Sequence, residues 1–204
     1  MQRLIEQLPL RPGSHVSRDD GMCAMEMVAW LAGEAHSDEP ECACPVVAAI
    51  VRAMNDAMCD SQREQYLRPL VPHLVHSRGS AAVQRQRGML ALDCLVRVIL
   101  PLRLMSQGRR DEALLLRELP KILGRQELCA TRRLLQTFAS DQRAALWVLD
   151  RALDGMPPER FVAATVQVCR ECDGIAVWPH MVSLLHQLVS TTPVAASTTS
   201  VTLH

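Results

Sequence analysis

A long and almost entirely apolar run near the middle of the chain most limits what this protein can fold into. Between residues 88 and 102, apolar side chains occupy nearly every face of the helix that Ser80 would open, and only Asp93 and Arg97 interrupt them. A helix that is apolar on all sides must be covered on all sides by other elements. The run is too short and too charged to cross a bilayer. We therefore predict a central buried helix that starts at Ser80 and ends near Met105.

The remainder of the chain also carries helical signals, whereas strand signals are absent. No stretch of four or more residues alternates between apolar and polar side chains beside hairpin turn residues. Proline interrupts the helical pattern at Pro101, where we expect a kink, and at Pro69 and Pro72, where we expect short pieces. Further helices are predicted at 22–32, 45–57, 111–119, 121–139, 141–153, 158–172 and 175–189, with Asp19 or Asp20, Pro45, Asp141 and Pro158 at or before the starts of four of them.

These segments together predict an all-α fold. A chain of this length can bury a sizeable core, so we expect a single helical domain over residues 1–190, with about seven to nine helices joined by irregular loops. The turn at 107–110 is where that domain could be subdivided. Residues 191–204 are of low complexity and lack an apolar period, which predicts a disordered C-terminal tail.

Composition and net charge narrow the functional classes. The net charge at pH 7 is zero and only 3% of the residues are aromatic, so neither a basic field nor stacking side chains favour nucleic acid as a partner. Eight cysteines without a signal peptide indicate a reducing compartment. We expect a cytoplasmic protein that does not bind a membrane.

Potential ligands and catalytic groups are densest in residues 19–45. The predicted helix 22–32 has a single charge, Glu26, which shares a face with Cys23 and Trp30. A carboxylate on an apolar helix has a raised pKa unless a cation or hydrogen bonds compensate for its burial. Three roles for Glu26 follow: an ion pair with an arginine from position 52 or from the long helix, a metal ligand, or a general acid or base.

A zinc site is the sharpest chemical hypothesis for this stretch. Cys42 and Cys44 directly precede a helix, and a helix N-terminus stabilises a thiolate. Together with Cys23 and His36 they would supply the four ligands of a tetrahedral Cys₃His zinc site. Buried structural thiols, or a catalytic cysteine, are the alternatives. The cofactor prediction is therefore zinc or none.

The same stretch resembles a family of uncharacterised bacterial proteins, chiefly from high-GC organisms. The resemblance covers roughly residues 19–110 and brings no activity that could be transferred to this chain. One departure is Glu39, at a position where the family often has a histidine, and this departure bears on any metal site. The matching positions are Met22-Cys23-x-x-Glu26, Ala32-Gly33-Glu34, Ser37-Asp38-x-Pro40-x-Cys42-x-Cys44-Pro45, Asn55-Asp56, Leu67–Pro72 and Arg78-Gly79.

Charge is distributed unevenly along the chain. Residues 19–41 contain seven acids and no Lys or Arg, whereas residues 78–110 contain seven arginines and one acid. The two segments could pack together and neutralise each other. Alternatively, they could form two surface patches of opposite sign that attract a charged partner.

The leading functional hypothesis is a non-enzymatic protein-binding or adaptor protein of bacterial or mobile-element origin, with another protein as its partner. The first alternative is an enzyme with a pocket between 22–32 and 34–45, in which Cys23 or Cys42 acts with Glu26 and His36. The second is a zinc-stabilised regulator that touches nucleic acid through Arg78, Arg85 and Arg87. The sequence leaves homo-oligomerisation open.

Overall fold

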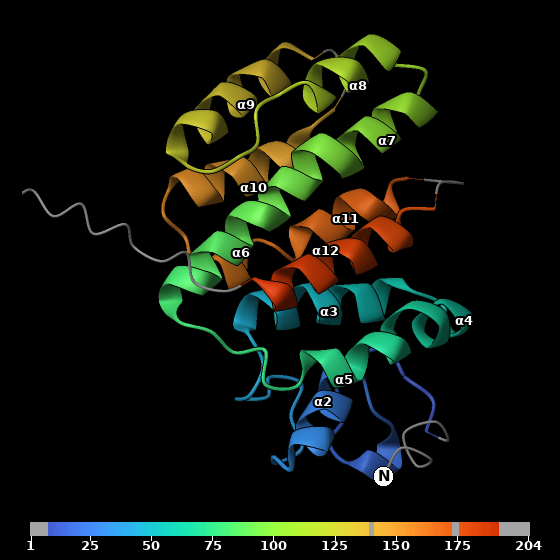
Figure 1. Ribbon diagram of the computed structural model, residues 1–204. Helices are drawn as coiled ribbons and strands as arrows, with labels where there is room; N and C mark the ends of the chain where they lie inside the picture. The colour runs from blue at the N-terminus through green and yellow to red at the C-terminus, as the bar shows by residue number, and fades with distance from the viewer. Residues whose placement is uncertain (1–7, 139–140, 173–175, 192–204) are drawn as a thin grey trace, which may run out of the picture.

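The computed structural model describes residues 8–138, 141–172 and 176–191, and it is helical, as predicted (Figure 1). In this part of the chain the extended pairing amounts to one isolated bridge, between Leu10 and Met22. The elements are η1 (Arg18–Asp20), α2 (Ala24–Ala32), α3 (Pro45–Ala57), α4 (Asp60–Gln62), η2 (Arg63–Leu67), η3 (Arg68–Leu70), α5 (Val71–Leu74), α6 (Ala81–Cys94), η4 (Leu95–Ile99), α7 (Leu100–Ser106), α8 (Arg110–Arg117), α9 (Arg125–Thr137), α10 (Arg143–Leu153), η5 (Pro158–Arg160), α11 (Ala164–Arg170) and α12 (Trp178–Ser190).

The predicted long helix is present as the continuous run α6–η4–α7. Ser80 opens it, because its hydroxyl accepts a hydrogen bond from the amide of Val83. The predicted irregularity near Pro101 takes the form of the π-helical turn η4 directly before it. Proline has no amide hydrogen and its ring crowds the preceding turn, and a locally wider turn accommodates both effects.

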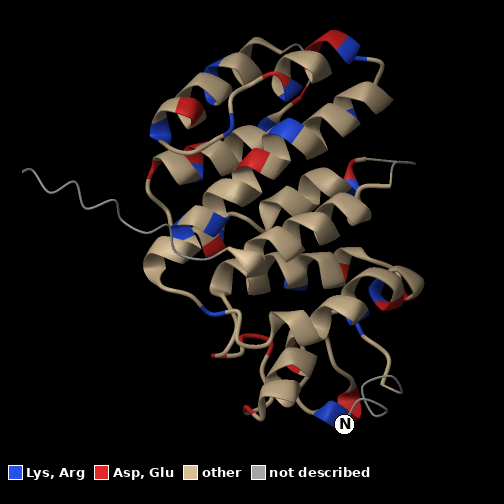
Figure 2. Cartoon of the chain, viewed as in Figure 1, with Lys and Arg blue, Asp and Glu red and all other residues tan. Residues whose placement is uncertain are grey.

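Helix α3 lies between the N-terminal elements and the rest of the protein. On one side it contacts α2, and on the other it contacts α6, α11 and α12 (Figure 1). Lys, Arg, Asp and Glu are sparse on α3 and α11 and absent from α12, as expected for interior helices (Figure 2). Helices α7 to α10 form the far end of the molecule.

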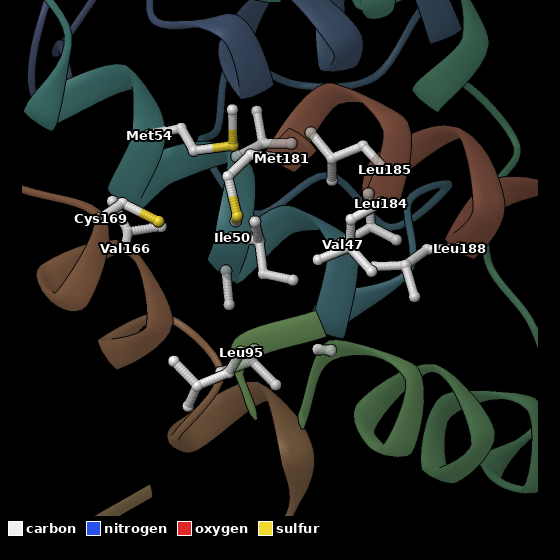
Figure 3. Packing of buried hydrophobic residues seen from close by; sticks show 14 of the residues in the cluster. Val47, Ile50, Met54, Leu95, Val166, Cys169, Met181, Leu184, Leu185 and Leu188 are labelled. Atoms are coloured by element: carbon white, nitrogen blue, oxygen red, sulfur yellow. The ribbon is translucent and has the colours of Figure 1, made fainter. Parts of the chain in front are cut away.

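The core forms where α3, η4, α11 and α12 meet (Figure 3). Ile50, Leu95 and Met181 are fully buried there. One hydrophobic cluster extends from Leu10 to Leu188 and includes residues on both sides of 107–110. The described chain is therefore a single helical domain.

Several predicted helix boundaries are corrected. Helix α2 is capped by Cys23, and not by Asp19 or Asp20, which lie in the separate turn η1. The predicted helix 121–139 begins only at Arg125, and 158–172 is divided between η5 and α11. Pro45 does begin α3, and Asp141 accepts a hydrogen bond from the first amide of α10. The predicted tail falls almost entirely on residues 192–204, which lie outside the described residues.

Gly88 allows α6 to approach η5 closely. A Cβ atom added to Gly88 would lie 2.7 Å from Cβ and 2.8 Å from Cγ of Pro158. A proline ring cannot move aside as a flexible side chain does. We expect Gly88→Ala to lower the free energy of unfolding by about 1–2 kcal/mol, because overpacking outweighs the gain in helix propensity.

The sign of this effect should reverse when the ring is removed. In a Pro158→Gly background the same Gly88→Ala change should stabilise the protein by about 0.5–1 kcal/mol, because only the propensity term remains. Urea unfolding of the four proteins in this double-mutant cycle measures both values. Equal effects in the two backgrounds would show that the contact with Pro158 does not limit the packing of α6.

Candidate functional site

The candidate site is built where an extended N-terminal segment, residues 8–20, lies against α2 and α3. We call this segment the N-terminal strap. The amide of Arg11 donates to the carbonyl of Met22 at 2.9 Å, beside the isolated bridge at Leu10. The Arg18 guanidinium lies 5.4 Å from the centroid of the Trp30 ring. The strap therefore covers the N-terminal end of α2, where the predicted site residues begin.

Polar side chains from α3 and η2 also hold the strap. The Asn55 side chain is fully buried, and its amide nitrogen donates to the Arg11 carbonyl at 2.8 Å while its oxygen accepts from the Ala24 amide at 3.2 Å. One buried amide thus joins three separate segments. Two carboxylates accept from strap amides: Asp56 from Gly13 at 2.7 Å and Glu64 from Leu10 at 3.0 Å.

Glu26, in the first turn of α2, is the centre of the site. Its side chain is 1% exposed. Its Oε2 accepts from the Cys23 amide at 2.7 Å and from Nδ1 of His15 at 2.8 Å, and its Oε1 accepts from the His15 amide at 2.6 Å. The Cys23 sulfur in turn accepts from the Glu26 amide at 3.4 Å, so the two residues form a reciprocal cap. One carboxylate therefore both caps α2 and fixes the strap.

The expectation that Glu26 faces an arginine is wrong. His15 is its partner, and His36 Nε2 lies 3.6 Å from Oε1 and 3.1 Å from the His15 carbonyl oxygen, to which it donates. Arg52, one of the arginines expected there, is 3.0 Å from a carboxylate oxygen of Glu39 and donates to the Asp38 carbonyl at 2.9 Å. The physical reason is that the strap brings His15 onto Glu26, where its backbone amide and its ring engage both carboxylate oxygens.

Hydrogen bonding decides the charge state of Glu26. Burial alone raises the pKa of a carboxyl group, but the amides of Cys23 and His15 and the His15 ring outweigh burial and lower the pKa of Glu26 below its ordinary value. Glu26 is thus a carboxylate at neutral pH. It is suited to orienting His15 and does not act as a proton donor.

The thiols of Cys23 and Cys42 are held in the protonated form at neutral pH. Burial raises the pKa of the Cys23 thiol to about 12, and burial also raises the pKa of Cys42. A protonated, buried thiol is a poor nucleophile. The burial of Cys23 and its bond to the Glu26 amide, together with this protonation, favour a structural role for Cys23 over a catalytic one.

The five residues expected to converge do so only in part. Cys23, Glu26 and His36 meet, together with His15. The amides of Cys42 and Cys44 contact other residues, Glu34 Oε1 at 2.8 Å and Ser77 Oγ at 3.1 Å respectively. In the described chain no group of three or more His, Cys, Asp or Glu side chains could hold a metal ion. Zinc bound by Cys23, His36, Cys42 and Cys44 stays a prediction, which metal analysis of the purified protein tests.

The three predicted arginines have different environments. Arg87 is buried, and its Nη1 donates to the Ser77 carbonyl at 2.5 Å, so it supports the turn before α6. Arg78 is exposed and donates to the Glu41 carbonyl at 2.7 Å. Arg85 is exposed on α6 and forms no ion pair with the described residues. Of the three, Arg78 and Arg85 are available to a partner.

The acidic and basic segments do not neutralise each other through ion pairs between described residues. Figure 2 shows acidic residues, in red, in and around α2, and basic residues, in blue, along α6 and in the segment before it. The link between the segments is made by backbone: Arg78 donates to the Glu41 carbonyl through its side chain and to the Cys42 carbonyl, at 2.9 Å, through its amide. Both segments therefore keep charge at the surface.

Three functional positions of this site were missed from the sequence: His15, Asn55 and Arg63. His15 lies in the irregular segment RPGSHVSR, where no periodicity assigns its neighbours. Asn55 is one of the positions that resemble the uncharacterised bacterial family, but that resemblance assigns it no role. Arg63 donates to the carbonyls of Leu10, Asn55 and Met58 from a buried position. A buried asparagine or arginine can be identified only when the helix face that carries it is known.

None of the described helices is both long enough and apolar enough to cross a membrane. Comparisons of the chain with protein families, with curated proteins and with solved structures give no match. The roles of the strap and of the group formed by His15, Cys23, Glu26 and His36, which we call the Glu26 cluster, are therefore inferred from the structure of this chain alone.

Proposed function

We propose that this protein is a non-enzymatic binding or adaptor protein that recognises a segment of another protein on the outer face of α6. The observation that carries the proposal is a hollow of about 500 Å³ between α6 and the segment before α9. Its lining includes Arg85, Met89 and Leu90 of α6 together with residues 121–123. We call it the α6 groove.

One apolar side chain of the α6 groove, that of Leu123, is unusually exposed. Leu123 is 73% exposed, and Met89 and Leu90 are partly exposed beside it. On the other side of Met89 a second hollow, of about 370 Å³, includes Met156 and Phe161 in its lining. Scattered apolar side chains are ordinary on a protein surface, but a large exposed one beside a hollow is typical of an interaction site.

The charged side chains of the α6 groove indicate which kind of partner segment would fit it. Arg85 and Lys121 contribute the charged groups of the lining, which contains no Asp or Glu. Neither cation forms an ion pair with a described residue. Complementarity therefore favours a partner segment with apolar side chains for Met89 and Leu123 and with carboxylates for Arg85 and Lys121.

The Glu26 cluster supports this proposal over an enzyme. Glu26 bonds to backbone amides and to a histidine of the strap, and the pKa of the neighbouring Cys23 thiol is about 12. Such groups hold a fold together. An enzyme that acts through Cys23 and Glu26 would need at least one of them to reach a substrate in a reactive protonation state.

Selection from a peptide display library tests the proposed function. We expect wild-type protein to select peptides in which apolar residues are interspersed with Asp or Glu. Leu123→Asp should weaken binding of a selected peptide by about tenfold or more without changing the melting temperature, because the side chain is exposed. Arg85→Glu should weaken binding similarly, and replacing the peptide's acids by Lys should restore part of the affinity for that variant.

An exposed arginine on another helix provides the control. Arg170→Glu, at the end of α11, makes the same charge reversal at an exposed residue outside the groove lining, and it should leave the affinity for the peptide unchanged. Selection of no peptide, or equal loss of binding in all three variants, would contradict the proposal. Self-association of the wild type that Leu123→Asp abolishes would instead show that a second copy of this chain occupies the groove, and this too would contradict it.

A further inference from the structure

A third hollow, of about 480 Å³, lies between the loop before α3, the start of α3 and η5. Residues from four separate segments line it, and three of them are arginines: Arg52, Arg78 and Arg160. Glu39 and Glu159 are its acids. Pockets of this size take small molecules.

The three arginines differ in how far their guanidinium donors are already bonded within the protein. Arg52 is engaged by Glu39 at 3.0 Å and by the Asp38 carbonyl at 2.9 Å. Arg78 uses Nη1 for the Glu41 carbonyl, and Arg160 forms no ion pair with the described residues. Guanidinium donors of Arg78 and Arg160 therefore remain available beside the hollow. Glu39 neutralises Arg52, and Glu159 is the one remaining acid of the lining beside Arg78 and Arg160, so the hollow keeps a net positive charge that a bound anion would balance.

The start of α3 adds an electrostatic field that favours a bound anion. Pro45, the first residue of this 13-residue helix, lines the hollow, and Cys44 gives the first turn no side-chain cap. The positive end of the helix dipole is therefore left without a protein acceptor from its cap residue. The hollow has room beside the start of α3, because the neighbouring lining side chains there are small: Ala43 and Ala48.

We propose that this hollow binds a small anionic molecule through a phosphate or carboxylate group, with Arg78 and Arg160 as its ligands. A planar guanidinium presents paired N–H donors that match the oxygens of either group. The site is independent of the α6 groove, since neither Arg78 nor Arg160 lines that groove.

Titration of the full chain with inorganic phosphate tests the site, at constant ionic strength and pH. We expect saturable binding by calorimetry, together with a rise in melting temperature that saturates over the same concentrations. Arg160→Gln should weaken binding by about tenfold or more, because it removes charged donors and leaves the contact between Arg78 and Glu41 in place. A parallel titration with succinate separates carboxylate from phosphate recognition.

Arg117 is an exposed arginine on α8, and Arg117→Gln is the matched control. This variant should bind phosphate as the wild type does. Circular dichroism and the melting temperature in the absence of anion verify that Arg160→Gln is folded. Saturable binding of phosphate or succinate that Arg160→Gln weakens and Arg117→Gln does not supports the site. Binding of neither anion, or binding that both variants leave unchanged, overturns it, and peptide binding at the α6 groove would be unaffected by that result.

Discussion

Glu26→Gln is expected to lower the free energy of unfolding by about 3 kcal/mol. Glutamine keeps one carbonyl oxygen but places an NH₂ group where amides of Cys23 and His15 and the His15 ring donate. At least one buried donor then faces another donor. Hydrogen bonds to charged groups each contribute about 1.5–3 kcal/mol, and a buried donor without an acceptor costs about 1–3 kcal/mol.

Urea unfolding followed by circular dichroism measures this change. Glu41→Gln is the control, because the side chain of Glu41 is exposed and its effect should stay within about 0.5 kcal/mol. Hydrogen exchange should show the His15 and Cys23 amides losing protection in Glu26→Gln. An unfolding midpoint equal to that of the wild type would contradict the role of Glu26 as the clamp of the strap.

Lowering the pH should reproduce the loss of stability that Glu26→Gln causes. Because the folded-state pKa of Glu26 lies below its unfolded value, the stabilisation is fully present above about pH 4.3, the ordinary value for glutamate, and is lost as the pH falls through the folded-state pKa. The difference in stability between wild type and Glu26→Gln should therefore narrow as the pH falls below 4.3. A difference that stays constant down to the acid limit would show that Glu26 does not titrate in this way.

Arg63→Met is expected to have an effect of similar size, about 3 kcal/mol. Arg63 is 3% exposed, and it donates to the Asn55 carbonyl at 2.8 Å, to the Leu10 carbonyl at 3.3 Å and to the Met58 carbonyl. Methionine fills much of the volume but leaves these buried acceptors without their charged donor. Their desolvation is then uncompensated.

Arg133→Met, an exposed arginine on α9, controls for the loss of a positive charge and should change stability by less than about 0.5 kcal/mol. Both variants are compared by the same urea titration. If Arg63→Met unfolded at the wild-type midpoint, water would replace the guanidinium without cost, and the strap would not depend on Arg63.

The helices could be predicted where local signals act alone. Ser80 at an N-cap, Pro45 at a first helical position and the all-round apolar run before Pro101 each specify structure through their immediate neighbours. The start of α2 was missed because a cysteine, a weak acceptor, is its cap in place of the nearby aspartates. Asp19 and Asp20 cap nothing in α2 because Gly21, with a φ of 128°, turns the chain after them.

The site could be predicted only in part for a related reason. Glu26 was identified because a lone carboxylate on an apolar helix needs partners. Its partner was not identifiable, since His15 belongs to a segment without periodicity whose position is set by distant residues such as Asn55. The convergence of Arg52, Arg78 and Arg160 on one hollow depends on how α3 and η5 pack, which the charge pattern of the sequence does not encode.

We infer that the Glu26 cluster maintains the fold, and we propose that the α6 groove binds the partner. The most direct test measures stability and peptide affinity together, for Glu26→Gln and for Leu123→Asp, at a temperature where both are folded. We expect Glu26→Gln to lose stability and keep the wild-type dissociation constant, and Leu123→Asp to keep its stability and bind at least about tenfold more weakly. A Glu26→Gln variant that is stable but cannot bind, beside a Leu123→Asp variant that binds normally, would contradict it.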